Sequence, residues 1–312
     1  MHKHEQATVI GIMGPTASGK SALAMQLARR LNGEIISVDS ALVYKGMDIG
    51  TAKPGLAERA EIPHHLIDII DPAESFSTGA FRNQALSLID QIMARGKLPI
   101  LVGGTMLYFN ALTQGLAQLP VADEAVRNRL DKDCRELGKE EMHRRLALVD
   151  PAAAQRIHPN DPQRVQRALE VYELTGTPIS ELIKAGQANS FPFKMTKIIV
   201  APDDRKLLHQ MIAQRFMQML DQGFIDEVQG LFSRDDLNEK LPSIRAVGYR
   251  QIWSYLKGEY DYATMVEKGI AATRQLAKRQ FTWLRRESDA HWFESAEEKL
   301  VEQVVQYLRP DL

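Results

Sequence analysis

Residues 14–21 constrain the fold of this chain more than any other segment. They read G-P-T-A-S-G-K-S and match the pattern G-x-x-x-x-G-K-S at every fixed position. An apolar run at 9–13 precedes them, and a helical pattern with Leu23, Leu27 and Leu31 on one side follows. A strand, a glycine-rich loop and a helix in this order form a phosphate cradle. Backbone N–H groups at the helix start point into the loop, and the helix dipole favours anions there.

Two side chains in this loop complete the predicted phosphate site. Lys20 supplies a positive charge, and the Ser21 hydroxyl is placed to bind a Mg²⁺ ion that accompanies the phosphate. Kinases, ATPases and transferases that release diphosphate all use such a loop, so the motif predicts the ligand and leaves the reaction open. The residues that we predict to surround the diphosphate here are Gly14, Pro15, Thr16, Ala17, Ser18, Gly19, Lys20 and Ser21.

The composition is that of an ordinary globular protein. Of its 312 residues, 44% are hydrophobic and 25% are charged. No apolar run reaches the roughly 18 residues that a membrane-spanning helix needs, and the N-terminal segment has no apolar signal-peptide core. A single cysteine, Cys134, excludes an internal disulfide framework and a zinc site built from cysteines. We therefore expect a cytoplasmic, monomeric protein that has no membrane partner.

Positive charge is concentrated near the C-terminus, although the formal net charge is −1. The segment 268–286 contains six basic residues and no acidic one. Helical periodicity places Arg274, Lys278 and Arg285 on one stripe, with Phe281 beside it. A basic stripe beside an aromatic ring suits phosphate contacts and base stacking with RNA. A helix that packs on the core and extends its basic side chains into solvent accounts for the pattern equally well.

Strand and helix signals alternate in both the N-terminal and the C-terminal parts of the chain. Continuous apolar strands that alternate with helices predict an α/β fold, with a parallel sheet covered by helices on both faces. The apolar runs that we expect to form strands are 9–13, 34–38, 66–70, 98–102, 197–202 and 291–293. The helices that we expect around them run from Thr78 to Gly96, over 205–220, 224–232 and 262–284, and from Ala296 onward.

The middle of the chain has a different character. Residues 123–191 contain several helical patterns and no convincing strand. Asp161 can cap a helix whose first residue is Pro162, and its apolar positions from Val165 to Tyr172 repeat on one face. Thr177 and Pro178 begin another helix. The sequence therefore predicts a P-loop core at 1–119 and 193–312, interrupted by an all-helical insertion at 120–192.

Asp39 and Thr105 each follow a predicted strand, as the glycine-rich loop does. Ligands of parallel α/β sheets bind at the carboxyl ends of the strands, so we expect these three features to lie close together. Asp39 is then a candidate general base, although a carboxylate that caps a turn or holds a magnesium-bound water fits the same position. Thr105 stands where many P-loop enzymes end a strand with an aspartate, which weakens an ATPase interpretation.

Several further segments extend the pattern over nearly the whole chain. They read SVDSALVYKGMDIGTAKP at 37–54, PHHLIDIIDP at 63–72, ILVGGTMLY at 100–108, HPNDPQRVQRALEVY at 158–172, IRAVGYRQ at 244–251 and ATRQLAKRQFTWLR at 272–285. Together with the glycine-rich loop, they closely resemble the bacterial tRNA dimethylallyltransferases, also called tRNA isopentenyltransferases. The C-terminal zinc finger of the eukaryotic relatives is missing.

The resemblance implies a substrate, an acceptor and roles for individual residues. The loop at 14–21 would hold the diphosphate of dimethylallyl diphosphate rather than ATP, with Mg²⁺ and with Arg215 directed at the diphosphate. The acceptor would be the exocyclic N6 amine of the adenosine 3′ of the anticodon. Asp39 matches the general base of the family, and Thr105 matches a threonine beside the reacting centre.

The resemblance also assigns tRNA contacts, and it fits an insertion that grips the anticodon stem-loop. In the core, the matching positions are Asp39, Ser40, Ala41, Leu42, Thr105, Arg245, Ala246, Val247, Gly248, Tyr249, Arg250, Lys278, Arg279, Gln280, Phe281, Thr282, Trp283, Leu284 and Arg285. In the insertion they are Arg127, Gln163, Arg164, Val165, Gln166 and Arg167. On the residues alone, the exposed side of the insertion helix at 163–167 is equally well explained as a solvated face.

Two other functions use the same motifs. A small-molecule kinase of the nucleotide or shikimate kinase type would bind ATP in the loop and use Asp39 as base toward an acceptor hydroxyl. A non-catalytic RNA-binding protein would use a nucleotide as a switch. The sequence Gly103-Gly104-Thr105 and the basic C-terminal helix argue against the kinase, and Asp39 has no role in the switch.

Overall fold

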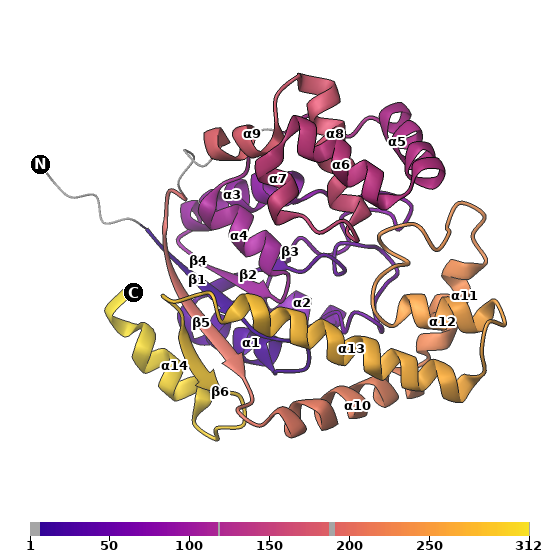
Figure 1. Ribbon diagram of the computed structural model, residues 1–312. Coiled ribbons are helices and arrows are strands. Elements are labelled where there is room, and N and C mark those ends of the chain that lie inside the picture. The colour runs from indigo at the N-terminus through magenta and orange to yellow at the C-terminus, as the bar shows by residue number, and fades with distance from the viewer. Residues whose placement is uncertain (1–6, 118, 187–190, 312) are drawn as a thin grey trace, which may run out of the picture. The chain divides into compact units, whose positions relative to one another are not determined.

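A six-stranded, fully parallel sheet forms the centre of the main unit (Figure 1). The computed structural model describes residues 7–117, 119–186 and 191–311. The strand order is β3-β2-β4-β1-β5-β6, and each neighbouring pair is parallel. The strands are β1 (Thr8–Met13), β2 (Gly33–Val38), β3 (His64–His65), β4 (Leu98–Gly103), β5 (Lys194–Ala201) and β6 (His291–Glu294).

Helices cover both faces of this sheet, because its strands are apolar on both sides. Helices α1 (Lys20–Leu31) and α14 (Leu300–Leu308) pack on one face, where Leu27 and Val304 contact alternate strand residues such as Ile12. Helix α3 (Thr78–Ala94) contacts β2 and β4 and lies on the opposite side of the sheet in Figure 1. The α/β fold with a parallel sheet is therefore confirmed.

A second cluster of helices lies against the loop that follows β2. Helices α10 (Arg205–Asp221), α11 (Phe224–Phe232), α12 (Tyr249–Leu256) and α13 (Tyr262–Leu284) form it. Their core contains Phe216, Phe224, Tyr249 and Trp253, and it includes Met47 from the loop. The loop that follows β2 therefore packs into a core formed by helices from the C-terminal part of the chain.

The second unit spans Thr113–Phe191 and is entirely helical over its described residues. It begins before residue 120, where the sequence placed the boundary. Its own apolar core includes Leu130, Leu146 and Val165. Asp161 caps α8 by accepting a hydrogen bond from the Arg164 N–H at 3.2 Å, with Pro162 as the first helical residue. The helices are α5 (Glu124–Leu137), α6 (Lys139–Val149), α7 (Pro151–Arg156), α8 (Pro162–Thr175) and α9 (Ile179–Gly186).

Some predicted elements differ from the structure. Residues 66–70 do not form a strand, because Leu66 and Asp68 adopt left-handed φ angles of 61° and 56°. The helix expected from Thr78 is capped by Ser77, and the closing helix begins at Leu300 rather than Ala296. Helices α2 (Leu56–Glu61), α4 (Met106–Gln114) and α12 were not among the helices expected from the sequence.

No helix within the described part of the chain is long and apolar enough to cross a membrane.

Candidate active site at the carboxyl edge of the sheet

The glycine-rich loop connects β1 to α1 and turns sharply between them. A Cβ atom on Gly14 would lie 2.4 Å from the Val200 carbonyl oxygen, so only glycine fits there. Ala17 and Gly19 have φ angles of 64° and 80°, which turn the loop back toward the start of α1. Among the described residues, no side chain caps α1 at Gly19. The first N–H groups of this helix are thus available to an anion.

Two basic side chains face this loop and are partly buried with little compensating charge. Burial and the nearby Arg215 guanidinium lower the pKa of Lys20 to about 8, while the Asp39 carboxylate opposes the shift. Burial also lowers the pKa of Arg215, and the Asp39 carboxylate again opposes the shift. Neither side chain forms an ion pair within the described ranges; Lys20 Nζ donates to the Pro15 carbonyl at 3.1 Å. Two cations held in this way favour an anionic ligand.

Hydroxyl groups rather than a carboxylate cluster are available for a metal ion here. Ser21 and Ser37 line one cavity with Lys20 and Asp39. The Ser37 hydroxyl is buried and has no hydrogen-bond partner in the described structure. No group of three or more metal-ligating side chains occurs among the described residues. This donor set suits Mg²⁺ that takes most of its ligands from phosphate oxygens and water.

Asp39 and Thr105 meet across neighbouring strand ends. Asp39 follows β2, and its Oδ1 accepts a hydrogen bond from the Ala41 N–H at 2.8 Å. The Thr105 N–H donates to the Val38 carbonyl at 3.2 Å, and Thr105 Oγ1 accepts from the Ser40 N–H at 3.1 Å. The expected proximity of these two residues is therefore observed, and their loops are joined by hydrogen bonds.

Gln280 links these loops, a role that the sequence analysis did not identify. Its Oε1 accepts from the Thr16 N–H at 2.8 Å, and its Nε2 donates to the Gly104 carbonyl at 3.0 Å. A Cβ atom on Gly104 would lie 2.3 Å from Nε2. Both polar ends of the side chain are thus engaged, and Gln280 holds the glycine-rich loop against the loop after β4.

Three cavities meet at Asp39 and Leu276, which line all of them. We name them after their most distinctive lining residues. The lysine chamber, of about 250 Å³, contains Lys20, Ser21 and Ser37. The aromatic chamber, of about 120 Å³, is lined by Phe216, Phe224 and Tyr249. The loop chamber, of about 430 Å³, is lined by Ser40, Thr105, Arg245, Arg279 and Trp283. Arg215 lies in the wall shared by the lysine and aromatic chambers.

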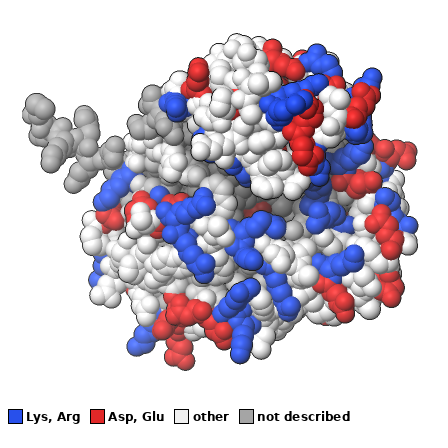
Figure 2. Space-filling view, in the orientation of Figure 1, with Lys and Arg blue, Asp and Glu red and all other residues white. Residues whose placement is uncertain are grey.

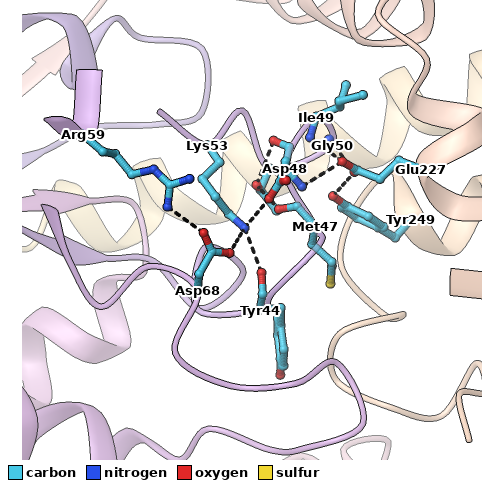
Figure 3. A network of polar contacts seen from close by, with 11 residues as sticks. Tyr44, Met47, Asp48, Ile49, Gly50, Lys53, Arg59, Asp68, Glu227 and Tyr249 are labelled. Atoms are coloured by element: carbon cyan, nitrogen blue, oxygen red, sulfur yellow. Dashed lines mark hydrogen bonds and ion pairs between the residues drawn. The ribbon is translucent and has the colours of Figure 1, made fainter. Parts of the chain in front are cut away.

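The segment 48–53 forms a wall of the first two chambers and is fixed from two sides (Figure 3). The Glu227 carboxylate accepts the N–H groups of Asp48, Ile49 and Gly50, and it also accepts the Tyr249 hydroxyl. Lys53, whose side chain is 1% exposed, donates to the Tyr44 carbonyl and to the carboxylates of Asp48 and Asp68. Lys53 is therefore engaged within the wall and is not available to a ligand.

The core residues that the resemblance assigns to tRNA divide into exposed and buried sets. Figure 2 shows Lys and Arg side chains along α13, which carries several of them. The Arg285 guanidinium lies 5.8 Å from the Phe281 ring centroid, and Phe281 stacks on Trp292 at 6.4 Å. The exposed assigned residues are Ser40, Arg245, Arg250, Lys278, Arg279, Thr282 and Arg285, whereas Gly248, Tyr249 and Leu284 are buried.

In the second unit, two of the three assigned arginines bind a buried acid. Glu170 has a fully buried side chain, and its carboxylate accepts from Arg127, Arg167 and the Asp123 N–H. Arg167 also donates to the Pro120 carbonyl at 2.7 Å. The remaining assigned residues are Gln163 and Arg164, which are exposed, Gln166, which bonds the Arg127 carbonyl and Asp131, and Val165, which is 1% exposed. The side chains of Val165, Tyr249 and Leu284 are buried in the protein core.

A parallel α/β sheet with a glycine-rich loop at a helix start, two partly buried cations and a carboxylate at the meeting point of three cavities is typical of an enzyme that acts on an anionic substrate. The sequence model of the family described as IPP transferase matches residues 42–287. The chain belongs to this family and is an enzyme that transfers prenyl groups.

Individual relatives agree with this assignment. The chain is 55% identical to a tRNA dimethylallyltransferase from Methylococcus capsulatus over 312 residues, which cover both chains completely. The structure of a tRNA isopentenylpyrophosphate transferase from Bacillus halodurans is 38% identical, covers 98% of this chain and 96% of that chain, and gives a TM-score of 0.72. The structure of a eukaryotic dimethylallyltransferase acting on tRNA gives a TM-score of 0.82 at 29% sequence identity. The match covers 98% of this chain and 79% of that chain.

Glu170 provides a test of the buried arginine cluster. Burial raises the pKa of Glu170, but hydrogen bonds from Arg167, Arg127 and the Asp123 N–H outweigh it and leave the pKa lowered. A lowered folded-state pKa stabilises the fold above the unfolded pKa of about 4.5, and the stabilisation is lost as pH falls through the folded value. We expect Glu170→Gln to reduce the free energy of unfolding at pH 7 by about 2–3 kcal/mol.

The measurement is urea unfolding at pH 7 and at pH 3.5. The difference in the free energy of unfolding between Glu170→Gln and the parent should be smaller at pH 3.5 than at pH 7. Glu173→Gln is the matched control, because Glu173 pairs with Arg129 on the surface of the same unit and should change stability by less than about 1 kcal/mol. Equal effects of the two substitutions would show that the Glu170 cluster contributes no special stability.

Proposed function

We propose that this enzyme transfers a dimethylallyl group from dimethylallyl diphosphate to the N6 amine of the adenosine 3′ of the anticodon in tRNA. The curated relatives, which match over nearly their full length, are named tRNA dimethylallyltransferases. The observation that carries the proposal is the meeting of three chambers at Asp39: one cationic, one apolar and one open beside basic residues. An anionic leaving group, a prenyl chain and an acceptor base each require a chamber of this kind.

The diphosphate occupies the lysine chamber in this proposal. The N–H groups at the start of α1, together with Lys20 and Arg215, bind its oxygens and stabilise the charge that develops as it leaves. Mg²⁺, when bound, neutralises further charge on the leaving diphosphate, and Ser21 is the residue that would hold it. Arg215 lies in the wall between the lysine and aromatic chambers, so it faces the diphosphate at the end where the prenyl group begins.

The chemical step exchanges one bond for another at the allylic C1 atom. The bond between C1 and the diphosphate oxygen breaks, and that oxygen keeps the electron pair. The N6 lone pair forms the new C–N bond, and Asp39 takes the proton that the amine loses. An amine conjugated to a purine is a poor nucleophile, so its orientation against C1 is essential. Asp39 is suited to this role because it borders all three chambers.

The acceptor base enters through the loop chamber. Ser40 and Thr105 line it from the strand ends, and Arg245 and Arg279 bring positive charge to its rim. The adenosine must leave its stack, at a cost of roughly a few kcal/mol that is lower in a loop than in a duplex. The exposed basic residues of α13 bind the surrounding phosphates in this proposal, with Arg127 and Arg164 on the helical insertion as further contacts.

The kinase alternative fits the site less well. The Thr16 N–H of the glycine-rich loop is bound by Gln280, and the strand beside β1 ends at Gly103 where a Cβ atom would lie 2.0 Å from the Val38 carbonyl oxygen. Membership of a prenyl-transferring family supports the same choice.

The decisive experiment combines the protein, Mg²⁺, labelled dimethylallyl diphosphate and unmodified tRNA. We expect the label in the adenosine 3′ of the anticodon. Asp39→Asn keeps the size of the side chain but cannot accept the proton, so it should lower the single-turnover rate by about 10²–10⁴-fold while tRNA affinity stays within about twofold of the parent. Parent-like turnover by Asp39→Asn would exclude Asp39 as the base, and ATP consumption without transfer would exclude the proposed reaction.

Diphosphate binding should depend on pH through Lys20. In the free protein burial and Arg215 lower the pKa of Lys20 to about 8, so the side chain loses its charge as pH rises through that value. We expect the affinity for dimethylallyl diphosphate to fall about tenfold between pH 7 and pH 9. Lys20→Arg stays charged over this range and should show a flatter pH profile by calorimetry. Parallel profiles for the two proteins would contradict a role for Lys20 in holding the diphosphate.

The basic stripe of α13, formed by Arg274, Lys278 and Arg285 and called the α13 stripe below, should control the salt dependence of tRNA binding. Lys278 is exposed, so Lys278→Gln should weaken binding and reduce the slope of log K against log salt by about 0.7–0.9. Lys97 is the matched control, because it lies immediately before β4 at the opposite, amino edge of the sheet. Lys97→Gln should leave the slope unchanged. An identical slope in both variants would identify the α13 stripe as a solvated face.

A further inference from the structure

The aromatic chamber is lined mainly by apolar side chains. Asp39 and Arg215 are the charged residues in its described lining. Behind them the wall consists of side chains such as Ile212, Met219 and Val247. The Tyr249 hydroxyl is engaged with Glu227 at 2.5 Å and offers the chamber no free polar group. A hydrocarbon chain attached to a diphosphate beside Arg215 would be buried here.

Phe224 forms the floor of this chamber. It is fully buried and lies between two glycines, where a Cβ atom would stand 2.1 Å from its ring at Gly50 and 2.9 Å at Gly248. Its ring packs edge-on against Tyr249 at 4.9 Å and against Phe216 at 6.3 Å between centroids. The floor is therefore made of aromatic rings in tight contact with backbone.

The aromatic rings of this floor are held in place from more than one side. Glu227, which follows Phe224 by one helical turn, holds the N–H groups of Asp48 to Gly50 and the Tyr249 hydroxyl (Figure 3). On the other side, a Cβ atom on Gly269 of α13 would stand 2.2 Å from the Phe216 ring. The loop, α10, α11, α12 and α13 thus pack these rings tightly together, and a core packed at this density resists displacement by a longer ligand.

We propose that Phe224, with Met219 beside it, sets the length of prenyl chain that the enzyme accepts and makes it reject ten-carbon allylic diphosphates. This inference rests on the proposed function, because it assumes that the prenyl group enters the aromatic chamber when diphosphate occupies the lysine chamber. The chemistry with a longer donor is the same: the C1–O bond breaks, the C1–N bond forms, and the amine proton goes to Asp39. The five additional carbon atoms of a ten-carbon donor collide with the Phe224 ring.

The test compares dimethylallyl diphosphate with geranyl diphosphate in the parent and in Phe224→Leu and Met219→Ala. Each substitution removes side-chain volume from the chamber wall and leaves apolar space that a ligand can fill. We expect the ratio of kcat/KM for geranyl to that for dimethylallyl diphosphate to rise at least about tenfold in each variant. Mass spectrometry of the tRNA adenosine identifies which prenyl group was attached.

Phe232→Leu is the matched control. It makes the same substitution on the same helix, but the Phe232 ring packs on Trp253 at 4.8 Å and does not line the chamber. Its geranyl-to-dimethylallyl ratio should stay at the parent value. Thermal unfolding confirms that each variant folds, and Met219→Ala carries the test if Phe224→Leu does not.

Calorimetric binding of the two donors without tRNA separates this inference from the proposed function. Tighter geranyl diphosphate binding by the chamber variants supports the Phe224 floor even if no transfer to tRNA occurs. Dimethylallyl transfer to tRNA by the parent, with an unchanged ratio in folded Phe224→Leu and Met219→Ala, overturns the inference and leaves the function intact. A gain of geranyl binding in Met25→Ala instead would place the prenyl chain in the lysine chamber, which Met25 lines, and would also overturn it.

Discussion

Close backbone approach at the carboxyl edge of the sheet is the constraint on which the site depends. A side chain at Gly14 would collide with the Val200 carbonyl, and one at Gly103 would lie 2.0 Å from the Val38 carbonyl oxygen. Without Cβ atoms at these positions, the end of β1 lies close against β5, and the end of β4 lies close against β2. The glycine-rich loop, Asp39 and Thr105 consequently surround one small volume, and the Gln280 amide joins the loops across it.

The site keeps charges and polar groups that a structure built for stability alone would neutralise. Partial burial lowers the pKa of Lys20 and of Arg215, the Arg215 charge adds to the shift of Lys20, and Asp39 opposes both shifts. The Ser18 and Ser37 hydroxyls are buried, and no described residue bonds them. Each feature carries a free-energy cost in the free protein that an anionic ligand would relieve. Binding of a diphosphate would therefore both fill the site and stabilise the fold around it.

Two carboxylates organise parts of the protein that have little regular structure. Glu227 accepts three consecutive backbone N–H groups of the segment 48–50, and Glu170 accepts the Asp123 N–H near the start of the helical unit. Each acid satisfies donors of an irregular segment that no helix or strand could satisfy. In the main unit this arrangement fixes the wall of the lysine and aromatic chambers. In the helical unit it holds Arg127 and Arg167 in place.

Local chemistry in the sequence determined most of the fold and the reactive centre. Alternation of apolar strands and helices predicted the parallel sheet, and the rule that ligands bind at strand ends brought residues 14–21, Asp39 and Thr105 together. These features could be predicted because each depends on a few neighbouring residues.

The tertiary structure decided the rest. Gln280 lies 264 residues from Thr16, and Glu227 lies 177 residues from Gly50, so neither contact has a local signal. Residues 66–70 read as a strand, but the Asp68 carboxylate bonds Lys53 and Arg59 in a left-handed turn. Tyr249 and Leu284 belong to motifs of the resemblance, but they are buried because helix packing, which periodicity alone does not fix, turns them into the core.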